Sequence, residues 1–242
     1  MAATKGTFTR ILVDEYDFSG VSNSVKVAVS SEGLDVTAFQ DLANVYIPGV
    51  QMGMITQAGY FTGASANGFE SEFYDRLGSA TGVTVSVLFG TNVVGCPAYV
   101  VPGTNGRAMT ISAPVNGVIT LNGSWGEGTG IKRGRRLFGG TISATGAQTA
   151  IDFGAAGSAG GFAYLHVQAI TGSASSATIT VQSSSDNSTF ANEGTFTFSS
   201  VGVQAITMAS TVNRYIRLNC TSLGGATNFT VVGIACVTGV TM

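Results

Sequence analysis

Hydrophobic and polar residues alternate with a period of two through most of the chain. Residues 25–30 have the order Val-Lys-Val-Ala-Val-Ser, and the same alternation recurs over residues 83–87, 163–169 and 215–220, between clusters of Gly, Asn and Ser. This pattern is typical of β-strands with one buried face and one exposed face. The chain is therefore predicted to be mainly β and built from half-buried antiparallel strands.

One segment has the period of a helix instead. Phe69, Phe73 and Leu77 recur every four residues, with charged residues between them, and Gly78 follows as a stop signal. Glu72 and Arg76 lie four residues apart in the order that favours an ion pair along a helix. We expect a single short helix here, flanking a sheet.

The composition narrows the class of protein. Hydrophobic residues make up 44% of the 242 positions and charged residues 10%, which is opposite to the balance of a disordered chain. Apolar runs such as residues 83–89 are far shorter than the ~20 residues that span a bilayer, so we expect a soluble chain with no membrane partner. The formal net charge of -2 argues against a general attraction to nucleic acid.

Charge density indicates two domains. Residues 141–242 contain only two of the 11 Lys and Arg residues and three of the 13 Asp and Glu residues, and Gly139 and Gly140 stand at the change. A glycine pair after a basic cluster suits a flexible connection. We therefore predict a first domain over residues 1–140 and an accessory, surface-exposed β-sandwich domain over residues 141–242.

The chain offers little catalytic chemistry. His166 is the single histidine, and neither an orienting carboxylate nor a nucleophile lies near it in the sequence. The alternating pattern around it predicts an exposed strand residue. No Gly-x-Ser-x-Gly motif is present, so we predict no enzyme and no catalytic residue.

Cofactor and metal sites are not expected either. Residues 123–130 are rich in glycine but lack the Gly-Lys-Ser/Thr ending of a phosphate-binding loop, which favours a glycine-rich strand or hairpin with Trp125 in the core or at a subunit contact. Asp186 and Asn187 suit a turn better than a metal cage. The three cysteines are predicted to be small buried thiols, with a disulfide between Cys220 and Cys236 left open.

The only basic cluster lies at residues 132–136 and includes Arg133, Arg135 and Arg136. A nucleic-acid patch is one interpretation, but aromatic residues do not interleave with the basic ones. A contact with the acidic group at residues 14–17 of a neighbouring copy is the interpretation that we favour.

Three segments carry a resemblance to a known family. They are TKGTFTRILVDEYDF at residues 4–18, LDVTAFQD at residues 34–41 and YIPGVQMGMITQAGYF at residues 46–61. In order and spacing they resemble the tail tube, or major tail, protein of long-tailed bacteriophages, and the resemblance extends over about residues 1–138. It implies a β-sandwich or partial barrel with one flanking helix, and a structural virion protein whose hexameric rings stack into a tube.

The resemblance also implies contacts and partners. The loop over Asp35, Phe39, Asp41, Tyr46 and Pro48 corresponds to one that touches neighbouring subunits or rings. The partners would be copies of the chain itself, the tape measure and terminator proteins, and phage DNA passing through the lumen without sequence-specific binding. The protein would be assembled in the host cytoplasm and located in the phage tail.

The second domain resembles accessory β-sandwich modules on phage tails and capsids, and also jelly-roll carbohydrate-binding or Ig-like modules. Tyr164 and Tyr215 are the strand-face aromatics that could contact a glycan. A capsid decoration protein and a host-glycan-binding module are therefore the two alternative functions.

Strand edges support self-assembly independently of the resemblance. Proteins protect unpaired strand edges with prolines, charges or bulges, yet this chain has four prolines and few charged residues. Closing a barrel from several copies would pair those edges.

Overall fold

The computed structural model describes residues 6–40, 42–62, 68–90, 93–126, 130–208 and 211–240, and it confirms a mainly β chain. It forms two compact units: unit 1 comprises residues 1–20, 86–100 and 132–242, and unit 2 comprises residues 21–85 and 101–131. Strands β5 and β6 contribute residues to both units.

The elements in chain order are η1 (Gly6–Phe8), β1 (Arg10–Val13), β2 (Tyr16–Asp17), β3 (Ser22–Asp35), β4 (Tyr46–Tyr60), α1 (Phe69–Tyr74), β5 (Val83–Leu88), β6 (Pro97–Ser112), β7 (Thr120–Gly126), β8 (Lys132–Ile142), β9 (Gly146–Ala147), β10 (Ile151–Asp152), β11 (Gly161–Gly172), β12 (Ala177–Ser184), β13 (Ala191–Phe198), β14 (Gly202–Met208), β15 (Tyr215–Ser222) and β16 (Ala226–Val237). In the described part of the chain, no helix is long and apolar enough to cross a membrane.

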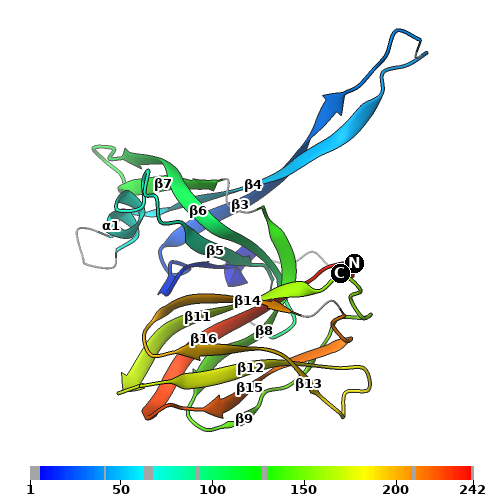
Figure 1. Ribbon diagram of the computed structural model, residues 1–242. Coiled ribbons are helices and arrows are strands. Elements are labelled where there is room, and N and C mark those ends of the chain that lie inside the picture. The colour runs from blue at the N-terminus through cyan, green and yellow to red at the C-terminus, as the bar shows by residue number, and fades with distance from the viewer. Residues whose placement is uncertain are drawn as a thin grey trace. The chain divides into compact units, whose positions relative to one another are not determined.

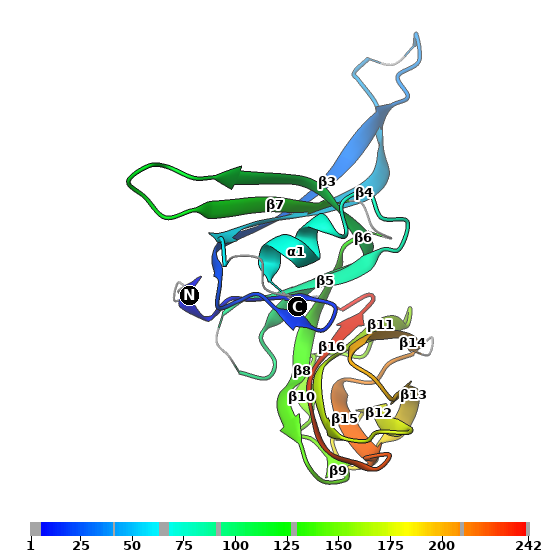
Figure 2. The same ribbon diagram turned by 90° about the vertical axis from the view of Figure 1, so that its left-hand side faces the viewer.

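Unit 2 is an antiparallel sheet with a helix against one face. The strand order is β3-β4-β7-β6, and Figure 2 shows α1 beside this sheet. Ile55 on β4 pairs with Val27 on one side and with Trp125 on the other, which places all three on the same face. The centre of the Phe73 ring of α1 lies 4.3 Å from the centre of the Trp125 ring, so this face of the sheet forms the core of the unit. Trp125 was predicted to lie either in the core or at a subunit contact, and its buried side chain shows that it lies in the core.

Residues 123–126 of the glycine-rich segment belong to β7, on which the helix packs directly, and residues 127–129 lie outside the described residues. A Cβ atom at Gly123 would lie 2.4 Å from Cε2 of Phe73, closer than any side chain can approach. Glycine in β7 therefore allows the ring of Phe73 to lie against the backbone, as expected for a strand that another element approaches closely.

The predicted helix is confirmed, but α1 ends at Tyr74, whereas the spacing of hydrophobic residues continues to Leu77. After Tyr74 the backbone tightens, because the N–H of Arg76 donates to Phe73 and the N–H of Leu77 donates to Tyr74, three residues back in each case. The expected ion pair between Glu72 and Arg76 is present.

Unit 1 contains two packed sheets (Figure 1). One has the order β14-β11-β16-β8 and continues through β6, β5, β1 and β2, and the other has the order β10-β15-β12-β13, with β9 beside β15. Apolar side chains from both sheets, among them Leu165, Phe196, Leu218 and Phe229, form the core between them.

The sheet that contains β11 and β16 is covered on its other face as well. Tyr164, Val232 and Ile234 pack there against Leu12 of β1 and Leu88 of β5. The alternation at residues 163–167 therefore reflects two different buried environments and not one buried and one exposed face, whereas Ala169 near the end of β11 is exposed. The same holds for β5, in which all six residues are buried.

The segment around residue 140 is a paired strand. Residues 135–142 of β8 pair with β16, with a bulge between Gly233 and Ile234. Residues 132–242 all belong to unit 1, so no boundary between the two compact units falls near residue 140. The expected flexible connection is thus part of the sheet. The division into domains 1–140 and 141–242 stays a prediction, as does the accessory role of the second.

Candidate assembly surface

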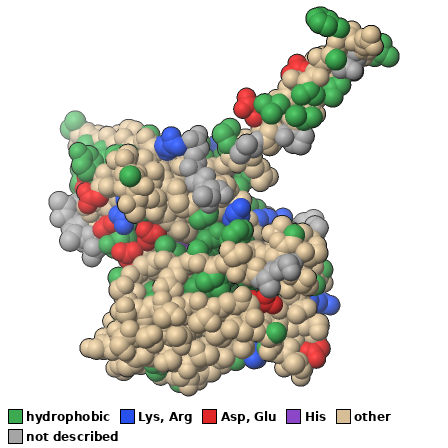
Figure 3. All heavy atoms as spheres, in the orientation of Figure 1, with side chains coloured by type: hydrophobic (Ala, Val, Ile, Leu, Met, Phe, Trp, Pro, Cys, Tyr) green, Lys and Arg blue, Asp and Glu red, His purple; other side chains and the backbone are tan. Residues whose placement is uncertain are grey.

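Among the described residues of unit 2, the two most exposed large hydrophobic side chains lie on an arm formed by β3, β4 and the loop between them. The pairing of β3 with β4 continues to Asp35 opposite Tyr46, so the arm projects beyond the rest of the unit 2 sheet (Figure 1). At its tip, Phe39 and Leu42 have relative exposures of 112% and 105%. Hydrophobic side chains recur along the arm in Figure 3. Two such side chains in full contact with water indicate a surface that becomes covered.

Hydrogen bonds hold the base of the tip loop. The backbone N–H of Val36 donates to the carbonyl of Val45, and the N–H of Val45 donates to Oγ1 of Thr37, each over 2.9 Å. The side chain of Asp35 accepts from the N–H and the hydroxyl of Thr37. The Thr37 hydroxyl and N–H lower the pKa of Asp35, so its charge persists below the usual titration range.

The sheet of unit 2 is open at β3. Among the strands that the structure describes, β3 pairs only with β4. Its 14 residues contain no proline and carry only Lys26, Glu32 and Asp35 as charged side chains. An edge of this length with few protecting residues is able to accept a strand from another chain.

A hollow lies on the face of the same sheet that is opposite to α1. It is lined by Ala28, Ser30, Met52, Gly53, Met54, Arg107 and Gly126 and has a volume of about 330 Å³. Met52 and Met54 are themselves exposed. Flexible methionines around a hollow form an adaptable apolar surface.

The predicted contact residues fall into two groups. Asp35, Phe39 and Tyr46 are exposed on the arm, and Pro48 lies on β4 opposite Gly33. Asp41 lies outside the described residues. The structure thus brings the first group together on one hairpin, whereas the three arginines belong to unit 1.

The three arginines have different environments. Arg133 is exposed on β8, and the Arg135 guanidinium lies 5.9 Å from the centre of the Phe153 ring. Arg136 is buried, and its guanidinium donates to the carbonyls of Phe138 and Gly139. The side chain of Arg136 is thus enclosed by its own chain, and its role in a subunit contact stays a prediction.

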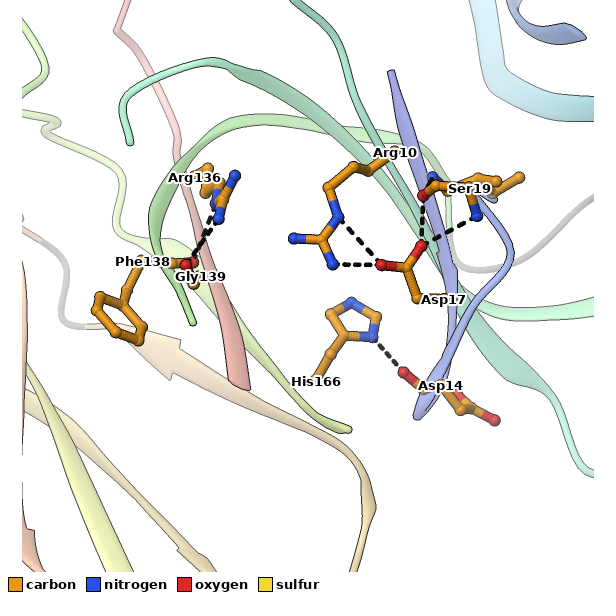
Figure 4. A network of polar contacts seen from close by, with 9 residues as sticks. Arg10, Asp14, Asp17, Ser19, Arg136, Phe138, Gly139 and His166 are labelled. Carbon is orange, nitrogen blue, oxygen red and sulfur yellow. Dashed lines mark hydrogen bonds and ion pairs between the residues drawn. The ribbon is translucent and has the colours of Figure 1, made fainter. Parts of the chain in front are cut away.

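The acidic group at residues 14–17 also has partners within the chain. The Asp17 carboxylate forms an ion pair with Arg10 and accepts from Ser19 (Figure 4). Burial alone would raise the pKa of Asp17, but the hydrogen bonds from Ser19 and Arg10 outweigh it and lower the pKa. A contact of the Asp17 carboxylate with basic residues of a neighbouring copy would have to compete with these bonds.

His166 is buried, and the prediction of an exposed strand residue is wrong. Its Nε2 lies 2.8 Å from Oγ of Ser86. Its Nδ1 lies 2.6 Å from the carbonyl oxygen of Asp14 (Figure 4). A serine hydroxyl, which can act as a nucleophile in enzymes, therefore lies next to the histidine in space, although not in the sequence. Both side chains have 0% exposure and the third group is a carbonyl oxygen, so a substrate could not reach this pair in the observed conformation.

The two tyrosines proposed for glycan contact also differ. Tyr164 is buried against Leu12 and Ile234, because β1 and neighbouring strands cover its face of the sheet, so it does not offer a surface ring. Tyr215 is partly exposed on β15, with the Arg214 guanidinium 5.1 Å from the centre of its ring. Neither tyrosine lines the hollow beside Met52 and Met54 or the hollow formed by residues 197–204 with Val167.

Comparisons with known proteins give similarities of fold only. No family model and no curated protein matches the chain. A chain from the virion of a native gene transfer agent particle aligns with a TM-score of 0.44 and 15% identity, over 54% of this chain and 98% of that chain.

Two other solved structures are similar at a comparable level. The SPP1 Dit protein, a hub adsorption apparatus protein of phages that infect Gram-positive bacteria, aligns with a TM-score of 0.37 and 11% identity over 94% of this chain and 98% of that chain. A chain of the anti-feeding prophage baseplate aligns with a TM-score of 0.39 and 8% identity over 55% of this chain and 97% of that chain. Scores this low carry no argument about function.

Proposed function

We propose that this chain is a structural virion protein, the tail tube subunit of a long-tailed phage, whose copies form stacked hexameric rings. The observation that carries the proposal is the open edge of β3 in a sheet that also extends an exposed apolar arm. Pairing that edge with a strand of the next copy would satisfy its backbone groups, and closing the ring would leave no free edge.

The sequence resemblance supports the same assignment. Two of its three segments, residues 34–41 and 46–61, coincide with the tip of the arm and with β4, which are the parts of unit 2 that this proposal assigns to contacts between copies. The resemblance and the exposed surface therefore point to the same part of the chain.

The role in genome passage would be passive. A subunit with a formal net charge of -2 provides little attraction for phosphate, so DNA would pass through the lumen without specific binding. The tape measure and terminator proteins are the other partners that this role implies.

Negative-stain electron microscopy and light scattering of the full chain over a range of concentrations test the proposal. We expect rings or stacked rings. The matched variant replaces residues 37–44 with Asn-Gly, which suits a two-residue hairpin turn between the hydrogen-bonded residues Val36 and Val45 and keeps the register of β3 with β4, and we expect it to fold and to assemble poorly. A full chain that stays monomeric at every concentration would contradict the proposal.

Immunogold labelling of the virion separates the alternatives. Gold along the whole tail supports a tube subunit. Gold on the head would indicate a capsid decoration protein, and gold confined to the tail end would indicate a component of the adsorption apparatus. Binding of the full chain to a glycan array, lost on Tyr215→Ala, would support a glycan-binding role for unit 1.

A further inference from the structure

We propose that Asn116 is a site of spontaneous chemical modification, at which the side-chain amide becomes an acid while the protein stays folded. The chain has four Asn-Gly pairs, and their asparagines are residues 67, 105, 116 and 122. An asparagine that precedes glycine is prone to this reaction, because glycine has no side chain to hinder attack on the amide and leaves the backbone permissive. Residue 67 lies outside the described residues, and the other three pairs have very different surroundings.

Asn116 lies in the loop that joins β6 to β7 (Figure 2). Residues 113–119 belong to neither strand, and both Asn116 and Gly117 are exposed. The N–H of Gly117 donates to the carbonyl of Pro114 over 3.3 Å, which is long for a hydrogen bond of this kind. The amide and the nitrogen that would attack it are therefore both accessible to water, and neither is held in a sheet.

The other two described pairs are held in the sheet of unit 2. Gly123 lies on β7 between β4 and β6, and Gly106 lies on β6 and pairs with β7. The Phe73 ring covers both glycines, since a Cβ atom would lie 2.4 Å from it at Gly123 and 3.2 Å from it at Gly106. Reaction at Asn105 or Asn122 would first require the strand to leave the sheet, which costs free energy.

The reaction needs only water as co-reactant. Hydroxide removes the proton from the main-chain nitrogen of Gly117, and this nitrogen attacks Cγ of Asn116. A C–N bond forms, and the side-chain nitrogen takes a proton from water and leaves as ammonia. The product is a five-membered cyclic imide. Water then adds to one of the two imide carbonyls and breaks its bond to the ring nitrogen, which gives aspartate or isoaspartate. Nothing is oxidised or reduced.

The modification changes the charge and the backbone of the hairpin. Residues 108–126 contain no charged residue, so the new carboxylate is the one charge on this stretch at neutral pH. It stands between Val115 and Val118, whose side chains are exposed. Isoaspartate also adds one carbon atom to the main chain, and the loop can absorb it because the pairing of β6 with β7 stops at Ser112 opposite Thr120. An uncharged apolar tip thus becomes anionic as the protein ages.

Peptide mapping of the full chain tests the proposal. The folded protein is incubated at pH 8 in water labelled with heavy oxygen, so that label enters only where the reaction occurs. Digestion with trypsin separates residues 77–107 from residues 108–132, and fragmentation of the second peptide distinguishes Asn116 from Asn122. We expect aspartate and isoaspartate at Asn116, and roughly tenfold less label or lower at Asn105 and Asn122. The same incubation in denaturant should label all three to a similar extent.

Two variants provide matched controls. Asn116→Gln would have to close a larger ring, so this variant should accumulate less of the acidic form on ion-exchange chromatography. Asn122→Gln makes the same change at an exposed position of β7 and should accumulate as much as the wild type. Gly117→Ala is less suitable, because its Cβ atom would lie 2.7 Å from Cγ of Pro114 and would disturb the turn itself.

The outcomes bear on this inference alone. No label at Asn116 in the folded chain, or equal label at Asn105, Asn116 and Asn122 there, overturns it. The reaction takes place within one chain and goes beyond the proposed function. Its failure therefore leaves the tube proposal standing, and a failure of the chain to assemble leaves the modification site standing.

Discussion

The Nε2 atom of His166 lies 2.8 Å from the Oγ atom of Ser86, a residue 80 positions earlier in the chain. On the other side of the ring, Nδ1 lies 2.6 Å from the carbonyl oxygen of Asp14. A carbonyl oxygen only accepts, so Nδ1 carries the proton and Nε2 accepts from the Ser86 hydroxyl. The ring is thus held as one neutral tautomer that connects β11 to β5 and to the turn after β1.

This arrangement predicts a loss of stability in mild acid. Burial lowers the pKa of His166 to about 4, with the nearby Arg10 acting in the same direction and the Asp14 carbonyl and Asp17 opposing it. An unfolded histidine binds its proton near pH 6.5. The contribution to stability is therefore complete above pH 6.5 and is lost as the pH falls towards 4, by on the order of 3 kcal/mol.

Urea unfolding of the wild type and of His166→Gln at several pH values between 7 and 4 measures this effect. The variant should be less stable at pH 7 and should show a shallower fall in the free energy of unfolding over this range. Equal pH dependence in the two proteins would show that His166 is not the titrating group.

Substitution at Gly123 tests the packing of the helix on its sheet. The Cβ atom of Gly123→Ala would overlap the Phe73 ring, so the ring or the strand must shift, at a cost of about 1–3 kcal/mol. Gly20→Ala is the control, since nothing lies within 4 Å of a Cβ atom there. Thermal unfolding should show a lower midpoint temperature for Gly123→Ala only. Equal midpoints for the two variants would show that the close approach of Phe73 to Gly123 does not require a glycine.

A fragment of residues 141–242 tests the boundary suggested by charge density. The fragment lacks nearly all of β8, which pairs with β16, and lacks Leu12 and Leu88, which cover Tyr164 and Ile234. We expect it to bind a hydrophobic dye and to unfold less cooperatively than the full chain. A fragment with full-chain cooperativity would support residues 141–242 as an independent domain.

The cysteines should be unreactive in the folded protein. Cys96, Cys220 and Cys236 are free and buried, and burial raises the pKa of Cys236 to about 12. A thiol reagent at pH 8 should label none of them in native buffer and all three in denaturant. Labelling of fewer than three in denaturant would instead indicate a disulfide.

The sequence by itself determined the class of secondary structure. The period of two around Val27 and Leu165 and the period of four around Phe73 each reflect a local geometry, and the structure has β3, β11 and α1 at those places. The turn at Asp186 is likewise local, because its carboxylate accepts from the N–H groups of Ser188 and Thr189. The apolar character of the arm tip was also visible in the segment containing Phe39.

Only the tertiary structure decided which faces are covered. His166 and Tyr164 looked like exposed residues because polar side chains alternate with apolar ones around them, and Arg136 was considered a surface contact because it belongs to the basic cluster. Residues 10–20 and 86–100, remote in the sequence, enclose the first two, and Arg136 bonds to carbonyls of its own strand. Local periodicity records that a strand has two faces, but coverage of the second face depends on which distant segments pack there, and this depends on the whole chain.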